Sequence, residues 1–417
     1  MSIKSRALIT FIILFVILIF ISFSFKKEFK SILNLTKFYT IKKLNLYKDN
    51  YKIDTVLYDL KISKRSINNI LNKYNYYTNN SPVGYLDSYN NRLFFITGQG
   101  SFYEVDDFQN SKFKKIKNNL NSILNKNNFV KSMSVRSLYI DKYNDKIFIS
   151  FTYHEPETKC VGLEIAESNL SNFTNLQFMS KFKTQCIKYD NFNDFNEMSS
   201  GGKLISLTEK YLLLTTGDFW QNDISQNDKK DYGKVLIIDK INYNHSIFSS
   251  GHRNQQGLTI YKDKIYASEH GPRGGDEINS IVKNENYGWP VVAYGPTYKK
   301  DYNKYYLKDH KEYKEPLFVF SPSIGISDIE FYNSDYLERW NGDMLVASMK
   351  NNTGMLRQLN PGLSLYRLKF DKNHEKVLYS EKIFIDDRIR DIEILDNGLI
   401  FFVTEENPSL YKVDLMQ

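Results

Sequence analysis

Cysteine, histidine and helix-favouring stretches are all scarce in this sequence. Its 417 residues include 2 cysteines, Cys160 and Cys186, and 6 histidines, and no CxxC, CxxCH or zinc-knuckle spacing occurs. The chain therefore lacks the motifs of a dithiol redox centre, an attached haem and a structural zinc. Long windows rich in Ala, Leu and Glu are also few, whereas 31 Tyr and 29 Phe favour strands. We expect an all-β protein.

Positive charge is present but not concentrated. Lys and Arg number 56 against 48 Asp and Glu, a formal net charge of +8, and the lysines are scattered, mostly beside asparagine. Nucleic-acid binding calls for basic residues gathered on one face or along one segment. We therefore expect a solvated surface and no nucleic-acid partner.

The N-terminal segment contains an uncharged apolar run, Ala7 to Phe25, with basic residues on both sides. As a helix rising 1.5 Å per residue, this run would span roughly 28 Å, close to the thickness of a bilayer core. No small-residue cleavage site follows it. Residues 1–30 are therefore predicted to be an uncleaved transmembrane helix, with a cleaved signal segment as the alternative.

The compartment of the remaining chain follows from this anchor. A long C-terminal domain crosses a membrane largely regardless of flanking charge, so we expect an inner-membrane anchor with the body in the periplasm or outside the cell. Residues 31–75 are predicted to be a stalk with a first irregular or strand segment. In an oxidising compartment Cys160 and Cys186 would form a disulfide. Two buried free cysteines are the alternative.

Paired strand patterns recur through the rest of the chain. Apolar stretches such as "YLLLTTGD" from Tyr211 and "DMLVASMK" from Asp343 are each followed by a turn and a second strand-like stretch. Matching strands lie 53 residues apart at Leu212 and Ile265, and 55 apart at Met344 and Leu399. A period near 50 is typical of propeller blades. Residues 76–417 are therefore predicted to form a six-bladed β-propeller, with a pair of β-sandwiches as the alternative.

One block, "GHRNQQGLTIYKDKIYASEHGPRGGDEINSIVKNENYGWP" from Gly251 to Pro290, has an unusual density of Gly, Arg, Asn, His and acidic residues. Arg253 and Asn254 offer donors that can clamp an oxygen-rich ligand. The tight "EHGPRGGDEIN" loop, with Gly271, Pro272, Gly274 and Gly275, can expose backbone carbonyls beside carboxylates, which suits a hard cation such as Ca²⁺. Turn capping and strand pairing are the alternative role for the carboxylates.

This block resembles the signature of the pyrroloquinoline-quinone (PQQ) dependent soluble sugar dehydrogenases, the glucose/sorbosone dehydrogenase family. The resemblance is strong over residues 251–298 and recognisable from about 196 to 417. It implies a six-bladed propeller with PQQ and Ca²⁺ in its mouth. Residue by residue, it implies carbonyl ligands for Ca²⁺ at Gly271 and Pro272, and cofactor contacts at Arg253, Asn254, Lys350 of "VASMK", and Arg388 and Arg390 of "DDRIRD". Arg388 and Arg390 alternate along a strand and are expected to share a face.

The sequence departs from the family at the catalytic base. The family's proton-abstracting histidine precedes a Gly-Gly-basic-Leu segment, and here Ser199 of "SSGGKLISL" holds that position. A serine hydroxyl is no general base at neutral pH. His270 is the first candidate for a substitute base and Asp218 of "TTGD" the second, while His252 is interpreted as structural.

Two functional hypotheses follow from the resemblance and this departure. In the first, the protein oxidises an aldose sugar to its lactone with PQQ and Ca²⁺ and passes electrons to an external acceptor, since the chain has no haem motif. In the second, the propeller is catalytically impaired and binds a sugar or a protein partner without redox turnover.

Overall fold

The computed structural model describes residues 49–71, 83–124, 134–170, 173–190, 195–296, 310–351 and 359–416. The chain divides into two units, residues 1–51 and residues 52–417, and the second holds the architecture described below. The predicted anchor, residues 1–30, lies outside the described residues and stays a prediction. Within the described ranges, no helix is both long enough and apolar enough to cross a bilayer.

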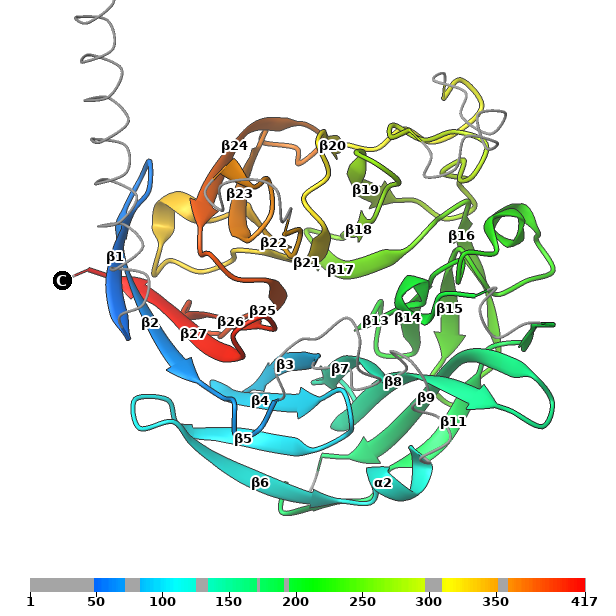
Figure 1. Cartoon of the computed structure of the whole chain (residues 1–417), viewed down its shortest axis with the longest axis horizontal. Helices are drawn as coiled ribbons and strands as arrows, with labels where there is room; N and C mark the ends of the chain where they lie inside the picture. Colours follow the sequence, from blue (N-terminus) through cyan, green and yellow to red (C-terminus); the bar gives the residue numbers. More distant parts are fainter. Residues whose placement is uncertain are drawn as a thin grey trace, which may run out of the picture. The chain divides into compact units, whose positions relative to one another are not determined.

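Six antiparallel sheets follow one another along the chain (Figure 1). The first three, in chain order, are β3 (Gly84–Tyr89), β4 (Arg92–Thr97), β5 (Phe102–Asp107) and β6 (Lys112–Asn118); β7 (Val135–Asp141), β8 (Lys146–Glu155), β9 (Cys160–Asn169) and β11 (Met179–Lys183); and β13 (Gly201–Ser206), β14 (Tyr211–Thr216), β15 (Lys234–Asp239) and β16 (His245–Ser250). Two short strands are added at the edges: β10 (Asn175–Leu176) on β6 and β12 (Ile187–Lys188) on β9.

The second three sheets repeat the pattern. They are β17 (Gln255–Tyr261), β18 (Lys264–Glu269), β19 (Asp276–Ile281) and β20 (Phe318–Phe320); β21 (Ile326–Phe331), β22 (Met344–Ser348), β23 (Ser364–Phe370) and β24 (Val377–Phe384); and β25 (Ile389–Ile394), β26 (Ile400–Thr404) and β27 (Ser409–Leu415), extended by β2 (Asp59–Ser66) and β1 (Asn50–Asp54). Among the described residues, four single-turn helices lie between strands: α2 (Leu120–Ile123), η2 (Glu197–Ser199), η3 (Asn222–Gln226) and η5 (Glu338–Trp340).

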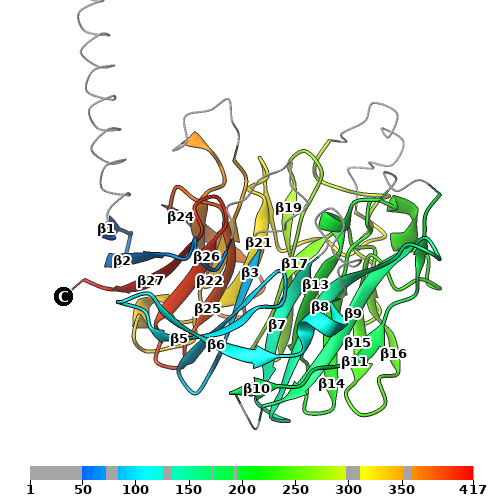
Figure 2. The same ribbon diagram turned by 60° about the horizontal axis from the view of Figure 1, so that its bottom comes forward.

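The first strand of each sheet faces a common centre, and these six strands close a ring. In order around the centre, β3 packs against β7, β7 against β13, β13 against β17, β17 against β21, β21 against β25, and β25 against β3 (Figures 1 and 2). The six-bladed propeller predicted from the repeats is confirmed, and the alternative of two β-sandwiches is wrong.

The last blade combines both ends of the propeller sequence. β2 pairs with β27 in antiparallel register from Leu60 opposite Leu415 to Ser66 opposite Ser409. The segment expected to hold a stalk with a first strand thus contributes a strand to the ring.

Apolar side chains fill the spaces between neighbouring blades. In β4, Phe94 and Ile96 pack towards the blade of β7, whereas Leu93 and Phe95 pack towards the blade of β26. Successive residues of a strand point to opposite faces, so a strand buried on both sides reads as an uninterrupted apolar run. This explains why "RLFFIT" and similar stretches lack the apolar-polar alternation of a half-exposed sheet.

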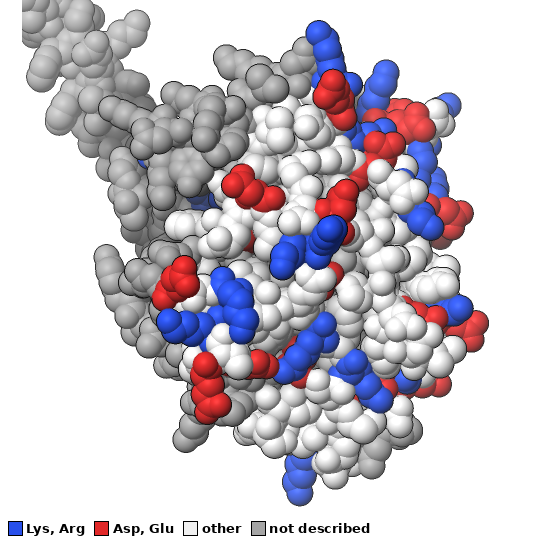
Figure 3. Space-filling view, turned by 90° about the vertical axis from the view of Figure 1, so that its right-hand side faces the viewer, with Lys and Arg blue, Asp and Glu red and all other residues white. Residues whose placement is uncertain are grey.

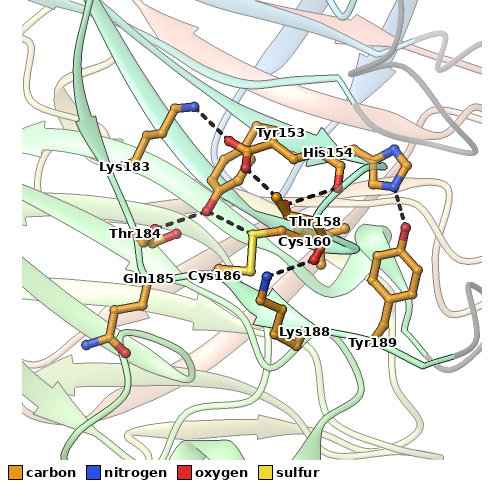
Figure 4. Close-up of a disulfide and its surroundings, with 12 residues drawn as sticks. Tyr153, His154, Thr158, Cys160, Lys183, Thr184, Gln185, Cys186, Lys188 and Tyr189 are labelled. Atoms are coloured by element: carbon orange, nitrogen blue, oxygen red, sulfur yellow. Dashed lines mark hydrogen bonds and ion pairs between the residues drawn. A yellow bond between two sulfur atoms is a disulfide. The ribbon is translucent and has the colours of Figure 1, made fainter.

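The two cysteines are bonded to one another. The Cys160–Cys186 disulfide has a Cα–Cα distance of 5.4 Å and joins the start of β9 to the segment just before β12 (Figure 4). The predicted pairing is confirmed, and the alternative of two free cysteines is wrong.

On the face that Figure 3 shows, Lys and Arg are interspersed with Asp and Glu.

Candidate functional site

The ring places the predicted site residues at one end. The six innermost strands start at the same end of the propeller, which we call the mouth (Figure 2). Arg253 and Asn254 precede β17, and Arg388 precedes β25. Because β18 is antiparallel to β17, with Gln255 opposite Glu269, the loop from His270 to Pro272 lies at the mouth too. The same pairing rule brings Asp218 and Lys350 there, since they follow second strands of other blades.

Arg253 connects two stretches of the predicted signature. Its Nη1 donates to the carbonyls of His270 at 2.9 Å and Gly271 at 3.2 Å. Its backbone N–H donates to the Glu269 carboxylate. The guanidinium lies 5.3 Å from the centroid of the Trp289 ring. Trp289 belongs to the "NYGWP" turn, so this turn holds the Arg253 guanidinium through a cation–π contact.

A second cationic pair comes from the last blade. Arg390 Nε lies 2.5 Å from Glu405 Oε1, and Arg388 Nη2 lies 3.3 Å from Glu405 Oε2. Arg388 Nη1 also donates to the Met349 carbonyl at 2.7 Å, beside Lys350. The two arginines share a face, as their alternation predicts. Burial acts to raise the pKa of Glu405, but Arg390 and Arg388 outweigh it and the pKa is lowered, so this fully buried carboxylate stays charged.

The pKa of His270 is shifted by Arg253 and by the Arg388–Arg390 pair. Burial is the largest cause that lowers its pKa to about 4; Asp276 opposes the shift, and Arg253, Arg390 and Arg388 add to it. Arginines from two different blades therefore act on one imidazole. The three predicted arginines thus lie near His270, which is neutral at neutral pH and has 20% of its side chain exposed.

Asn254 joins the two cationic groups through Gln256. Gln256 Nε2 donates to Asn254 Oδ1 at 2.9 Å, and Arg390 Nη1 donates to Gln256 Oε1 at 3.3 Å. Asn254 Oδ1 also accepts from Gly201 N at 3.1 Å, and its Nδ2 donates to Met198 O at 3.2 Å. Asn254 thus fixes the segment that carries Ser199 relative to the arginines.

Ser199, which the resemblance aligns with the family's base, forms a contact with Asp218. The Ser199 hydroxyl donates to Asp218 Oδ1 at 2.8 Å, and Trp289 Nε1 donates to Asp218 Oδ2 at 2.9 Å. Asp218 is fully buried. Burial raises its pKa, against the opposing effects of Arg253 and these hydrogen bonds. His252 is also fully buried, with its ring nitrogens 2.9 Å from Ser249 Oγ and 3.0 Å from Glu269 Oε2, in keeping with a structural role.

The carbonyls expected to bind Ca²⁺ lie in a loop held by Asp276. Gly271 N donates to Asp276 Oδ1 at 3.1 Å, while Asp276 Oδ2 accepts from the N–H groups of Ile324, Gly325 and Ile326. The Pro272 carbonyl accepts from Ser323 Oγ at 3.5 Å. Among the described residues, no cluster of three or more His, Cys, Asp or Glu side chains forms a metal site. A cation at Gly271 would rely on backbone oxygens and would compete with Arg253 for its carbonyl.

Two residues of the mouth were missed by the sequence reasoning. Arg136 of β7 is buried, donates from Nη2 to the Glu197 carbonyl at 2.9 Å, and hydrogen-bonds to Tyr85. Burial lowers its pKa, and Arg390 adds to that shift, so the two guanidinium groups are neighbours. Glu405 was missed because "TEEN" reads as an ordinary turn. No local pattern distinguishes either residue, although Arg136 sits at the start of an innermost strand, as Gln255 and Arg390 do.

The structure is a six-bladed propeller with positive charge gathered at its mouth. Four buried arginines and Lys350 line one end of the ring, and a neutral imidazole lies among them. The family model described as glucose/sorbosone dehydrogenase matches residues 90–412. The chain belongs to the glucose/sorbosone dehydrogenase family.

Three relatives show the extent of the likeness. The chain is 31% identical over 232 residues to an uncharacterized protein of Synechocystis, covering 50% of this chain and 53% of that protein, so it spans about half the length of that relative. It is 26% identical over 287 residues to the aldose sugar dehydrogenase YliI of Escherichia coli, covering 63% of this chain and 71% of that protein. The PQQ-bound aldose sugar dehydrogenase of Streptomyces coelicolor has a TM-score of 0.59 at 16% identity, covering 85% and 98%, which shows a shared fold.

Proposed function

We propose that the protein is a PQQ- and Ca²⁺-dependent sugar dehydrogenase that oxidises the anomeric hydroxyl of an aldose. The sugar loses two electrons and two protons at C1 and O1 and becomes a lactone, and the electrons pass to an external acceptor. The observation that carries the proposal is the hydrogen-bond chain from Arg390 through Gln256 to Asn254, which brings the arginines of two blades to one mouth. The PQQ-bound relative supports the choice of cofactor.

The residues of the mouth fit PQQ chemically. PQQ carries three carboxylates, and guanidinium groups bind carboxylates in a planar, bidentate manner. Arg253, Arg388, Arg390 and Lys350 would hold these groups, with Arg136 as a further cation. When bound, PQQ supplies a two-electron oxidant to the site. The carbonyls of Gly271 and Pro272 would hold Ca²⁺, which requires Arg253 to release Gly271.

The chain itself must supply a group that takes the hydroxyl proton. His270 is the better candidate, since it is neutral at neutral pH and 20% of its side chain is exposed. Asp218 is fully buried and already accepts from Ser199, Trp220 and Trp289, which leaves it in a positioning role. In this proposal Asp218 orients its hydrogen-bond partners and His270 accepts the proton.

The second candidate function is a propeller that binds sugar, or a protein partner, without redox turnover. It is favoured by one observation: the hydroxyl of Ser199 stands where the family has an imidazole, and it donates to Asp218. Loss of a general base typically lowers a rate by about 10²–10⁴-fold. PQQ could then be bound while turnover is slow.

The test uses the full chain extracted in detergent. PQQ and Ca²⁺ are added, binding is followed by the change in quinone absorbance, and turnover by dye reduction with a panel of aldoses. Saturable binding with dye reduction supports the proposal. Binding without turnover supports the second candidate. A chain that binds neither PQQ nor sugar contradicts the proposal and the sugar-binding form of the second candidate.

We further propose that the predicted segment Ala7 to Phe25 anchors the propeller at the inner membrane, with the propeller in the periplasm or outside the cell. The Cys160–Cys186 disulfide supports an oxidising compartment. Protease added to intact spheroplasts should digest the propeller if it lies outside the cytoplasm. Digestion only after lysis would place it inside.

A further inference from the structure

A turn beside Ser199 has an unusual sequence for its backbone. Asp218 to Gln221 form a turn in which Gln221 N donates to the Asp218 carbonyl at 2.7 Å. Its central residues, Phe219 and Trp220, have φ values of +50° and +67°. Turns with positive φ at both central positions normally contain Gly, Asn or Asp, because bulky L residues are disfavoured there. Strain of this kind is concentrated at functional sites.

The two aromatic side chains of this turn lie in opposite environments. Phe219 is fully buried and packs in one cluster with Ile187 and Tyr232. Trp220 is 57% exposed, whereas the other two tryptophans, Trp289 and Trp340, are 6% and 0% exposed. Phe219 therefore anchors the turn, and the turn holds the Trp220 indole in water. Burial in the core does not account for this tryptophan.

Trp220 lines a cavity of about 490 Å³. Another part of the wall is β12, which is fixed because Lys188 pairs with Cys160 on β9 and the adjacent Cys186 is bonded to Cys160 (Figure 4). The polar lining residues are Lys188, Gln221, Asn222, Asp223 and Lys230. The cavity thus combines an aromatic surface with amide, carboxylate and ammonium groups on a rigid frame.

This combination fits a sugar ring. One face of a pyranose consists of C–H groups that pack on an aromatic ring, while its rim of hydroxyls needs both donors and acceptors. The lining carries both signs of charge, from Lys188, Lys230 and Asp223. A phosphorylated ligand is negative and would be better matched by a lining with positive charge alone. Small-ligand sites commonly pair an apolar surface with a few polar groups of this kind.

Asp218 links the turn that carries Trp220 to the mouth by hydrogen bonds. The Asp218 carboxylate accepts from the Ser199 hydroxyl at 2.8 Å and from the Trp220 backbone N–H at 2.9 Å. The same residue thus orients the candidate reaction site and the aromatic surface. We propose that the Trp220 cavity binds a second sugar ring, so that the protein takes oligosaccharides whose reducing-end ring enters the mouth. The orientation of the oligosaccharide rests on the proposed function, but sugar binding at Trp220 does not.

The experiment measures binding without PQQ, so that it is independent of redox activity. Maltotriose, cellotriose and chitotriose are titrated against the full chain in detergent and compared with glucose, using calorimetry for affinity and tryptophan emission for location. We expect one trisaccharide to bind at least about tenfold more tightly than glucose and to shift the emission to the blue. Trp220→Ala should remove that difference in affinity.

Two further variants separate recognition from folding. Trp220→Gly relieves the positive φ, so its Tm should be unchanged or higher while trisaccharide affinity falls about tenfold. Tyr143→Ala, which removes a 65% exposed aromatic from another loop, should bind as the wild type does. Trisaccharides that bind no better than glucose, or full affinity in both Trp220 variants, would overturn the subsite even if glucose is oxidised. Trisaccharide binding without quinone reduction would contradict the proposed function and leave the subsite supported.

Discussion

The hydroxyl of Ser199 lies 2.8 Å from a carboxylate oxygen of Asp218; Ser199 ends η2 just before β13, and Asp218 follows β14, the strand that pairs with β13. A carboxylate in this position can orient an imidazole as well as a hydroxyl. Asp218 therefore orients the Ser199 hydroxyl and is placed to orient an imidazole introduced at the same position.

Ser199→His should increase the rate of dye reduction. An imidazole at this position can donate to Asp218 and accept the sugar's proton, and a general base contributes about 10²–10⁴-fold. Ser199→Ala is the matched control and should give no increase. A folded, PQQ-binding Ser199→His protein with unchanged turnover would show that the base is not the missing element.

Lys350→Ala should weaken PQQ binding about tenfold or more, since a hydrogen bond to a charged group contributes about 1.5–3 kcal/mol. The dissociation constant is measured by quinone absorbance. Lys142→Ala, at a 50% exposed lysine that pairs with Asp396, is the control and should leave the affinity unchanged. Equal affinities in the two variants would remove Lys350 from the cofactor site.

Glu405→Gln should destabilise the propeller by about 3–5 kcal/mol, because it leaves the buried guanidinium groups of Arg388 and Arg390 without their carboxylate. Urea unfolding measures the loss. PQQ should raise the Tm of this variant more than that of the wild type, since its carboxylates would replace the missing charge. An identical rise in both proteins would mean that PQQ does not contact these arginines.

Removal of the disulfide by Cys160→Ala with Cys186→Ala should cost about 3 kcal/mol, the chain-entropy value for a loop of its length; the two cysteines are 26 residues apart. Thermal unfolding with and without reductant measures it. The double variant should be insensitive to reductant, and a wild-type protein with the same Tm in both conditions would contradict a stabilising role.

Glu330 should make stability depend on pH. It lies on β21 and accepts from Thr259 Oγ1 at 3.0 Å. Burial raises its pKa to about 7, against Lys203 and Thr259, which lower it. The folded state therefore binds more protons than the unfolded state between about pH 4.5 and 7, and stability from this group falls as pH rises through that window, by at most about 1.4 kcal/mol per pH unit. Glu330→Gln should flatten this dependence in urea unfolding, and parallel curves for both proteins would refute the shift.

The propeller and part of its mouth could be predicted from local features. Repeated strand pairs define blades, and alternation along a strand places Arg388 and Arg390 together. The partners of these arginines could not be predicted, because Glu405 reaches them only through the pairing of β26 with β25. Arg136 lies inside "VRSLYID", which reads as an ordinary strand, and only the closed ring brings it beside Arg390. Contacts between blades depend on closure, which no single segment encodes.

The pairing of β2 with β27 closes the ring by joining two strands that lie far apart in the sequence. Synthesis proceeds from β2 towards β27, so the edge of β2 that pairs with β27 stays open until Ser409–Leu415 has left the ribosome. Five blades can form earlier, but the ring of blades closes only when β27 (Ser409–Leu415) has been synthesised and pairs with β2. A premature stop codon a few residues upstream would leave an open ring with an exposed edge, a species suited to capture by chaperones or proteases.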